Sequence, residues 1–430
     1  MLSKHKIKKI DGRMIFDSRG IPAVEAEVIL NDGSKGIAIS PSGASKGKNE
    51  AVEKRDNEKN FLGLSVYKNI KDIKSKINKS LIGCSIFEQK EIDNILINLD
   101  GTKDKSNLGA NTMIAVSMAA IKAAANFEKK DLWNYIDHSK KTLLLPIPQV
   151  QIFGGGAHAA NKIPIQDFLI IPNGAKDFYQ ALEWVFIIFK KTYEELNKKN
   201  LLFGYADEGG YWPCFGEIED VLIFLSNIIQ KSGFKLLSDV SIALDVAANN
   251  FYSESGYKFY NNRFINANEL LQILTDWISK YPIISIEDPF SEQDIIYYNL
   301  LKKKSPRYVQ IVGDDLVVTN KNLILKAKEK QAINSVLIKP NQVGTITETY
   351  AALNTSKKIG FINIISARSG ETEDVTISDL SVGWQTNQIK VGSFSRSERL
   401  AKWNQCIRIG EKLNNSFIMQ ENSKLGWNKL

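Results

Sequence analysis

The chain has 430 residues, 43% of them hydrophobic and 24% charged, which is typical of a soluble globular protein with two domains. The net charge of +8 comes from lysines scattered along the chain, not from one basic, aromatic-rich block, so we expect no nucleic-acid partner. The three cysteines, Cys84, Cys214 and Cys406, form no CxxC pair. This pattern argues against a disulfide framework or a zinc site and favours a reducing compartment.

The N-terminal segment is basic, but no apolar segment follows it, so we expect no signal peptide. The sequence contains no run of about 18 apolar residues, the length that a membrane-spanning helix needs. We therefore expect no membrane span and a cytoplasmic location.

The first part of the chain predicts strands followed by helices. Residues 6–17 and 22–31 predict a hairpin whose turn contains Asp17, Ser18, Arg19 and Gly20. The alanine-rich segment 110–127 predicts a helix, because alanine has the highest helix propensity. We expect an N-terminal α+β domain over residues 1–138.

After this point, short apolar runs alternate with longer amphipathic segments. The predicted helices span residues 178–198, 217–231, 267–280 and 345–358. Such alternation is typical of parallel βα units. Gly233 and Gly360 directly follow helical runs, as C-cap glycines do. We expect an α/β architecture over residues 139–430, a (β/α) TIM-type barrel of eight strands.

Six apolar runs end in, or run into, a charged residue. These residues are Asp245, Glu287, Asp314, Lys339, Arg368 and Lys390. Their spacing matches that of successive βα units. Because the carboxyl ends of barrel strands meet on one face, we expect all six residues in one mouth.

The three carboxylates Asp245, Glu287 and Asp314 suit a hard cation that takes oxygen ligands. Without a cation they would repel one another, and one would tend to take up a proton. The sequence therefore predicts a Mg²⁺ site. The alternative is that the carboxylates form ion pairs with Lys339 and Lys390, an arrangement that can coexist with the metal.

The two lysines suggest proton transfer. A lysine acts as a base only when its pKa is lowered, and burial, a metal ion or a second lysine each push the pKa in that direction. Carboxylates, metal and lysines together suit removal of a proton from carbon next to a carboxylate.

The chain resembles the enolase family from the Asp17–Gly20 turn to SRSER at 395–399. The motifs that carry the resemblance are PSGAS at 41–45, LDGT at 99–102, NLGAN at 107–111, DEGG at 207–210, SIEDPF at 285–290, VGDDLVVTN at 312–320, LIKPNQVGT at 337–345 and RSGETED at 368–374. A lysine or histidine base with one or two Mg²⁺ ions is a general property of that superfamily. The resemblance implies conversion of 2-phosphoglycerate, an anionic phosphorylated carboxylate, to phosphoenolpyruvate in glycolysis. It also implies two Mg²⁺ ions and a homodimer or larger even homo-oligomer.

The resemblance assigns roles to the residues that match the family's motifs. Asp245, Glu287 and Asp314 correspond to the ligands of the first Mg²⁺ ion, and Ser42 lies on the loop that holds the second. Lys339 corresponds to the base that removes the C2 proton, and Lys390 to the cation at the substrate carboxylate. On the leaving-hydroxyl side, Glu208 corresponds to the general acid, Asp167 to a carboxylate that assists it, and His158 to a histidine beside the substrate. Arg368 and Ser369 correspond to residues that bind the phosphate.

The sequence departs from the family pattern mainly on the leaving-hydroxyl and phosphate side. The family's Ser-His-Arg-Ser-Gly is Ser-Ala-Arg-Ser-Gly here, so Ala367 replaces a histidine. Asp167 replaces a glutamate and is shorter by one methylene. The remaining departures are Gly154 for Asn, Ser45-Lys46-Gly47 for Ser-Thr-Gly, Ile21 for Asn, and a bulky Trp212.

Three functions remain open from the sequence. The chain is a working or weakened 2-phosphoglycerate hydro-lyase, a paralogue that acts on another phosphorylated or phosphonate carboxylate, or a non-catalytic binding protein on the same scaffold. Ala367 and Asp167 favour the second. Retention of both lysines and all three carboxylates argues against the third.

Overall fold

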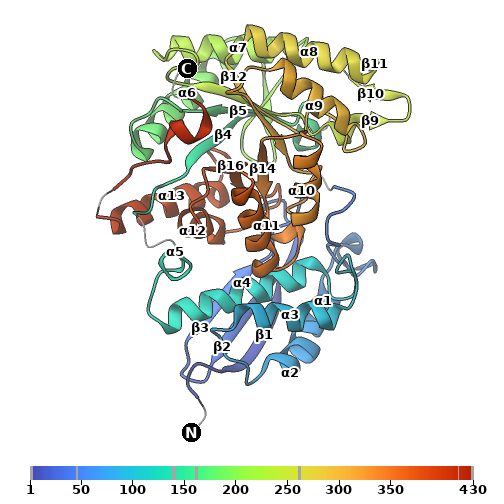
Figure 1. The fold of residues 1–430 in the computed structure, drawn as a ribbon, viewed down its shortest axis with the longest axis vertical. Coiled ribbons are helices and arrows are strands. Elements are labelled where there is room, and N and C mark those ends of the chain that lie inside the picture. Colours follow the sequence, from blue (N-terminus) through green and yellow to red (C-terminus); the bar gives the residue numbers. More distant parts are fainter. Residues whose placement is uncertain are drawn as a thin grey trace.

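The computed structural model describes residues 3–44, 47–137, 142–159, 163–259, 263–414 and 416–427. Figure 1 shows a small N-terminal α+β part at the bottom and a larger barrel above it. The expected fold class, an N-terminal α+β domain followed by an eight-stranded barrel, is confirmed. None of the helices in the described part of the chain is long and apolar enough to cross a membrane.

The N-terminal part is a three-stranded antiparallel sheet covered by helices. Its strands are β1 (Ile7–Phe16), β2 (Pro22–Leu30) and β3 (Lys35–Ile39). Its helices are α1 (Tyr67–Asp72), α2 (Asn78–Leu81), α3 (Gln89–Asp100), α4 (Ala110–Phe127) and α5 (Leu132–Tyr135). The predicted hairpin is confirmed, and the carboxylate of Asp17 holds its turn by accepting from the amides of Arg19 and Ile21 at 2.8 and 2.9 Å. The predicted helix 110–127 is α4, which is buried along almost its whole length.

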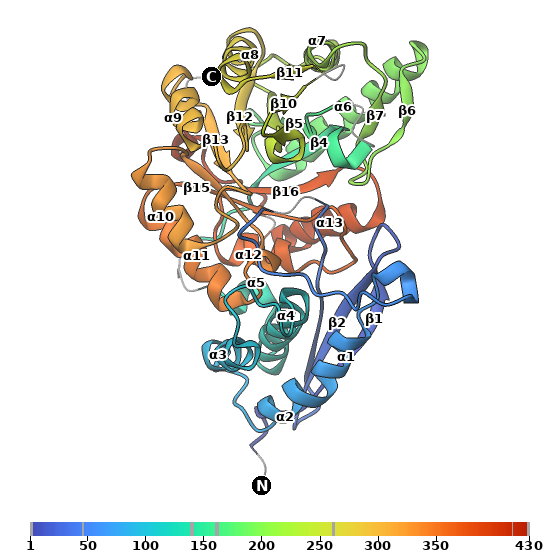
Figure 2. The same cartoon turned by 90° about the vertical axis from the view of Figure 1, so that its right-hand side faces the viewer.

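Eight strands form the barrel, and β16 pairs with β4 to close it. The strands are β4 (Ile147–Gly154), β5 (Asp167–Ile171), β8 (Ser241–Asp245), β12 (Ile283–Glu287), β13 (Gln310–Gly313), β14 (Ser335–Ile338), β15 (Ile362–Ser366) and β16 (Gln388–Ser393). The helices that follow them are α6 (Phe178–Lys198), α7 (Ile218–Lys231), α8 (Ala267–Lys280), α9 (Ile295–Lys304), α10 (Lys321–Glu329), α11 (Ile346–Lys358), α12 (Thr376–Gly383) and α13 (Ser397–Lys412). Figure 2 shows these helices around the barrel strands, with the N-terminal part below.

One barrel strand runs against the other seven, which corrects the expectation of purely parallel βα units. Strand β5 is antiparallel to both β4 and β8. The described residues between β4 and β5 contain the short 3₁₀ turn Gly156–Ala159 but no crossover helix, which only a parallel connection requires. The reversal places the first residue of β5, Asp167, opposite the last residue of β8, Asp245. Both carboxylates therefore lie at the same mouth.

The predicted barrel helices agree closely with the structure, because their first and last residues have clear capping chemistry. Asn266 and Glu269 form a reciprocal capping box at the start of α8. Thr345 caps α11, whose first turn the prediction included. Gly233 and Gly360 have φ of +91° and +79°, the left-handed conformation expected just after a helix.

Smaller strands extend the barrel on its outside. The hairpin β6 (Leu202–Tyr205) and β7 (Tyr211–Pro213) adds to the edge of β4. A separate three-stranded sheet contains β9 (Tyr252–Ser253), β10 (Gly256–Lys258) and β11 (Phe264–Ile265). Trp212, one of the departures, lies on β7 and packs on Phe203 with ring centroids 5.5 Å apart.

Candidate active site

Five charged residues form two ion-paired groups at the barrel mouth, which together we call the lysine half. Its members are Asp245, Glu287, Asp314, Lys339 and Lys390, all buried. The first four lie at or just after strand ends, and Lys390 lies within β16 because that strand continues to Ser393. The ammonium group of Lys390 lies 2.7 Å from both Asp245 Oδ2 and Glu287 Oε2. Lys339 donates to Asp314 Oδ2.

These contacts decide the protonation of both lysines. Burial alone would lower the pKa of Lys390, but Asp245 and Glu287 raise it well above its usual value. Burial and the nearby cations Arg368 and Lys390 also push the pKa of Lys339 down, as the sequence suggested. Asp314 and Glu287 outweigh them, so the pKa of Lys339 is raised in this ion-paired arrangement. The lowered pKa that a lysine base needs therefore stays a prediction for Lys339 beside a bound metal ion.

The donor set fits a hard divalent cation. Burial and the charge of Asp245 raise the pKa of Glu287 well above its usual range. The second oxygen of Glu287, Oε1, is buried and has no hydrogen-bond partner among the described residues. Ligand atoms of Asp288, Asp314 and Asp315 lie within 4.8 Å of one another, so Asp314 belongs to a cluster that could hold an ion. Asp245 and Glu287 would have to release Lys390 before they could act as ligands.

Asp288 and Asp315 lie in two motifs, SIEDPF and VGDDLVVTN, but the sequence analysis gave them no role. Asp288 accepts hydrogen bonds from the backbone amides of Asp314 and Asp315 at 3.1 and 2.6 Å. Burial and the neighbouring carboxylates raise its pKa well above the usual value. Asp288 thus fixes the backbone that carries Asp314.

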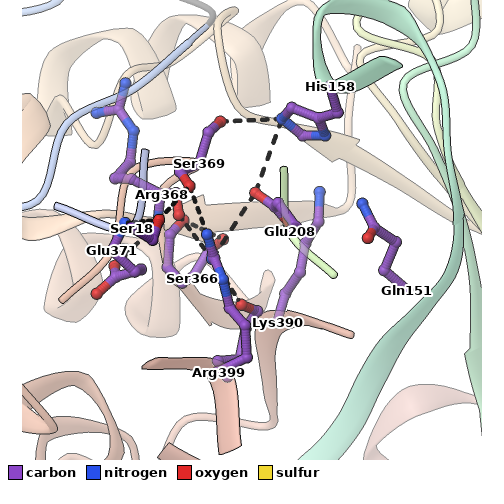
Figure 3. A network of polar contacts seen from close by, with 12 residues as sticks. Ser18, Gln151, His158, Glu208, Ser366, Arg368, Ser369, Glu371, Lys390 and Arg399 are labelled. Atoms are coloured by element: carbon purple, nitrogen blue, oxygen red, sulfur yellow. Dashed lines mark hydrogen bonds and ion pairs between the residues drawn. The ribbon is translucent and has the colours of Figure 1, made fainter. Parts of the chain in front are cut away.

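A second cluster, which we call the histidine half, contains His158, Asp167, Glu208 and Ser369. His158 Nδ1 lies 3.0 Å from Asp167 Oδ1, and His158 Nε2 lies 2.9 Å from Ser369 Oγ. Figure 3 shows the imidazole facing both Ser369 and Glu208, whose Oε1 lies 3.8 Å from Nε2. The ligand atoms of His158, Asp167 and Glu208 also lie within 4.8 Å of one another.

Ion pairing also determines the direction of the pKa shifts in the histidine half. Burial opposes ionisation of His158, but Asp167 and then Glu208 raise its pKa. Burial likewise opposes ionisation of Asp167, yet His158 and Lys390 lower the pKa of Asp167 to about 2. Lys390 Nζ lies 3.6 Å from Asp167 Oδ2, so the two halves touch at this pair.

The shorter Asp167 keeps its contact with the histidine. The side-chain amide of Gln151, on β4, donates to the same Asp167 oxygen that contacts His158. Gly154 also has a local reason: a Cβ atom there would lie 2.4 Å from Ala206 Cβ, just before Glu208. The departure at 154 therefore lets two segments of the histidine half pack closely.

The phosphate end of the predicted site surrounds Arg368, which is buried. Its Nη1 lies 2.6 Å from Glu50 Oε1 and 2.9 Å from Asn341 Oδ1. Arg399, on α13, is fully buried and donates to the backbone carbonyls of Arg368 and Ser369. Figure 3 shows Arg399 reaching from its helix toward the backbone of this loop.

A small cavity is lined by residues of both halves. It has room for about one water-sized sphere, roughly 10 Å³. Its lining includes Asp167, Glu208, Asp245, Lys339, Lys390 and Arg368, together with the buried Ala367. Entry of any ligand larger than a water molecule therefore requires these side chains to separate.

Ser42 lies at the edge of the site, and its hydroxyl is hydrogen-bonded to Asp17 and Arg19. It donates to Asp17 Oδ2 at 2.9 Å and accepts from Arg19 Nη2 at 2.7 Å. Its backbone pairs with Gly370, two residues after Arg368. Lys46, the altered residue of this loop, lies outside the described residues, as does Ser45.

The sequence analysis missed several polar residues that support the site. Gln166 donates to Asp245 Oδ2 at 3.0 Å, and Gln342 donates to Asp314 Oδ1 at 2.9 Å. Gln166 directly precedes the assigned Asp167, and Gln342 lies in the motif LIKPNQVGT that contains Lys339, which was the available signal. Glu50 and Gln151 carried no comparable signal.

Comparisons with known proteins agree with this geometry. The family model described as the enolase N-terminal domain matches residues 7–136, and the enolase C-terminal TIM barrel domain matches residues 142–425. The chain is 45% identical over 418 residues to an enolase of Ehrlichia canis (strain Jake), covering 97% of this chain and 99% of that protein. It is also 45% identical to enolases of Anaplasma marginale (strain St. Maries), covering 96% of both chains, and Pelagibacter ubique (strain HTCC1062), covering 97% and 99%. The resemblance read from the motifs is confirmed: the chain belongs to the enolase family and is a lyase of the phosphopyruvate hydratase type.

Proposed function

We propose that the chain is a Mg²⁺-dependent enolase that converts 2-phosphoglycerate to phosphoenolpyruvate and water in glycolysis. The lysine half carries this proposal. Two buried lysines and three buried carboxylates, carried by β8, β12, β13, β14 and β16 or the residues just after them, form two ion-paired groups at the mouth. Proton removal next to a carboxylate needs this combination of a base, a second cation and anionic ligands for metal.

Asp245, Glu287 and Asp314 would hold the first Mg²⁺ ion, and the loop of Ser42 the second. Bound metal supplies positive charge that lowers the pKa of nearby Lys339 and favours the doubly charged aci-carboxylate form of the substrate. Lys339, once released from Asp314, removes the C2 proton. Lys390 contributes positive charge beside the substrate carboxylate.

The histidine half would serve the second step, loss of the 3-hydroxyl group. Glu208 donates the proton that makes the hydroxyl leave as water. His158 and Asp167 lie beside it as a hydrogen-bonded pair and support its orientation. Arg368 and Ser369 bind the phosphate, which suits the planar guanidinium fork.

Further properties follow from family membership. We infer a homodimer or larger even assembly, a cytoplasmic location, and a boundary between the two domains near residue 138. The proposed boundary, between residues 138 and 139, lies outside the described residues, and the family-model matches that end at 136 and begin at 142 support it.

The test follows both steps on one substrate. Phosphoenolpyruvate formation and deuterium uptake at C2 are measured by NMR with and without Mg²⁺. Wild type is expected to do both only with Mg²⁺, and Lys339→Ala to lose both by about 10²–10⁴-fold, the usual contribution of a general base, while still binding substrate. If Lys339→Ala still exchanged the C2 proton at the wild-type rate, another group would be the base.

The variant Asp245→Ala tests metal binding separately from the role of Lys339 as the base. Mg²⁺ is expected to raise the melting temperature of wild type, because an ion that binds only the folded state stabilises it. Asp245→Ala should lose that shift. An unchanged melting temperature of wild type in saturating Mg²⁺ would remove the basis of the proposed mechanism.

A further inference from the structure

Arg399 is a fully buried arginine on α13 whose guanidinium group joins two strand ends of the barrel. Its Nη1 donates to the carbonyl of Arg368 at 2.7 Å and to the carbonyl of Val391 at 2.9 Å, and its Nη2 donates to the carbonyl of Ser369. Arg368 and Ser369 follow β15, and Val391 lies within β16. One planar group thus holds the loop after β15 against the neighbouring strand.

The acceptors of these hydrogen bonds are neutral, although Arg399 carries a buried charge. Hydrogen bonds to carbonyl groups offset only part of the cost of removing a guanidinium cation from water. The carboxylates that pair with this cation are Glu398, 3.6 Å from Nε, and Glu208, 4.0 Å from Nη1 (Figure 3). Nε has no hydrogen-bond partner among the described residues. The charge of Arg399 therefore faces both a neighbour on its own helix and a carboxylate of the histidine half.

The backbone of Ser369 matters because the Ser369 side chain contacts the histidine half. Its Oγ lies 2.9 Å from His158 Nε2, and His158 Nδ1 lies 3.0 Å from Asp167 Oδ1. The hydroxyl of a serine is one rotatable bond from the backbone, so its contact with the imidazole depends on where that backbone is held. Arg399 holds it by the carbonyl, and the contacts therefore run in one chain from Arg399 through Ser369 to His158.

Glu208 lies against the same part of β16 as Arg399. The amide of Ser393 donates to the carbonyl of Glu208 at 3.0 Å. A Cβ atom at Gly392 would lie 3.0 Å from both the carbonyl oxygen of Glu208 and Cδ of Arg399, and Gly392 has a φ of +109°. Glycine at this position therefore lets the side chain of Arg399 and the backbone of Glu208 approach the strand together.

We propose that Arg399 is a positioning residue for loss of the 3-hydroxyl group, because it holds Ser369 against His158 and places a positive charge beside Glu208. This inference deepens the proposed function and rests on its assignment of Glu208 as the general acid. None of the hydrogen bonds of Arg399 among the described residues reaches a side chain of the lysine half. Arg399 therefore controls dehydration and leaves removal of the C2 proton intact.

The experiment compares Arg399→Lys and Arg399→Met with a matched control, Lys402→Met. Lys402 is a fully buried cation on the same helix, and its partners, Glu371 Oε2 at 2.8 Å and the carbonyl of Thr372, belong to the same loop after β15 but not to the histidine half. The rates measured in saturating Mg²⁺ are C2 deuterium uptake and phosphoenolpyruvate formation from 2-phosphoglycerate. The melting temperature reports folding. The ¹⁵N shifts of the imidazoles report the His158 contact, and His158→Gln identifies its signals among the three histidines.

Arg399→Lys keeps the charge but loses the planar fork that bridges the carbonyl groups. Its kcat for dehydration should fall by about 10- to 100-fold, the range of lost charge-assisted hydrogen bonds, with a smaller change in KM. C2 deuterium uptake should not fall, and the His158 ¹⁵N shifts should change. Lys402→Met should lower the melting temperature but leave the ratio of the two rates and the His158 shifts unchanged. If Arg399→Met does not fold, Arg399→Lys carries the test.

A double variant tests whether Arg399 acts through Ser369. Ser369→Ala removes the hydroxyl that contacts His158 and should also slow dehydration more than C2 exchange. Because both changes disturb one contact, Arg399→Lys combined with Ser369→Ala should slow dehydration by less than the product of the two separate reductions.

Three results would overturn the inference. Equal loss of C2 exchange and dehydration in Arg399→Lys would show general support of the whole site. An equally large change of the rate ratio in Lys402→Met would show that any buried cation of α13 has this effect. Fully multiplicative effects of Arg399→Lys and Ser369→Ala would show that the two residues act independently. If wild type forms no phosphoenolpyruvate, the proposed function falls, whereas the His158 shifts of Arg399→Lys and Lys402→Met still decide whether Arg399 positions Ser369.

Discussion

Both halves of the site bury charged side chains, but the two halves pair those charges in different ways. In the lysine half, three carboxylates share two lysines that come from regularly spaced barrel strands. In the histidine half, two carboxylates share one imidazole held by a loop and by the reversed strand β5. The departures from the family pattern at Asp167 and Ala367 fall in or beside the histidine half. The comparison shows that the histidine half accommodates the shortened side chain, because Asp167, which accepts from Gln151, still reaches His158.

Removal of a cation from the lysine half should give the largest effect. Lys390→Met leaves Asp245 and Glu287 buried without their shared partner, so the free energy of unfolding in Mg²⁺-free buffer should fall by about 3–5 kcal/mol. Mg²⁺ should recover more stability in this variant than in wild type, because the released carboxylates would be available to the ion. Urea unfolding with and without Mg²⁺ measures both effects.

The control for this prediction is Lys412→Met, which removes an exposed ion pair with Asp131 at 2.6 Å. It should cost no more than about 1 kcal/mol. Equal losses in the two variants would show that the buried network behaves like a surface ion pair.

The second prediction concerns a double variant that brings the histidine half closer to the family pattern. Ala367→His with Asp167→Glu should raise the rate of dehydration more than the rate of C2 proton exchange, because the two steps use different halves. The gain is expected to be at most about 10²–10³-fold, the contribution of one active-site donor. The rates are phosphoenolpyruvate formation and C2 deuterium uptake, in wild type, both single variants and the double variant, since neighbouring changes are not additive. Equal acceleration of both steps would contradict the division into halves.

The smallest expected effect is a difference in pH dependence. The raised pKa of His158 means that its protonation stabilises the fold fully below the unfolded pKa of about 6.5, and this contribution is lost as the pH rises through the folded pKa. The stability difference between wild type and His158→Gln should therefore shrink from pH 6 to pH 9. The same difference for Lys339→Met should stay constant, because the raised lysine pKa lies above this range. Parallel urea titrations across the range measure both, and equal slopes would contradict the assignment.

Much of the fold could be predicted from the sequence because its signals are local. Amphipathic periodicity and capping residues such as Asn266 and Gly360 define the barrel helices within about one residue. The direction of β5 was not predicted, because an apolar run has the same pattern in either orientation. The glycine-rich segment after β4, with no helical pattern before β5, was the signal that the connection was not a parallel crossover.

The site was predictable to the extent that it lies at strand ends. A charged residue that ends an apolar run identified Asp245, Glu287 and Asp314, because barrel geometry brings strand ends together. The contact between Glu50 and Arg368 joins the N-terminal domain to the barrel, and no local pattern encodes it. Ion pairs of the three carboxylates with Lys339 and Lys390, which the sequence offered as an alternative that can coexist with the metal, are present in the structure.

Closure of the barrel between β4 and β16 also constrains how the protein is made. A ribosome releases the chain from its N-terminus, so the edges of β4 and β15 stay unpaired until residues 388–393 emerge. Such open edges promote aggregation, and pairing over so long a sequence separation is slow. Lys390 arrives on that last strand, so Asp245 and Glu287 cannot be buried as an ion-paired group before synthesis is almost complete. A nascent or truncated chain that ends before β16 therefore has both an open barrel and no active site, and is a substrate for chaperones or proteases.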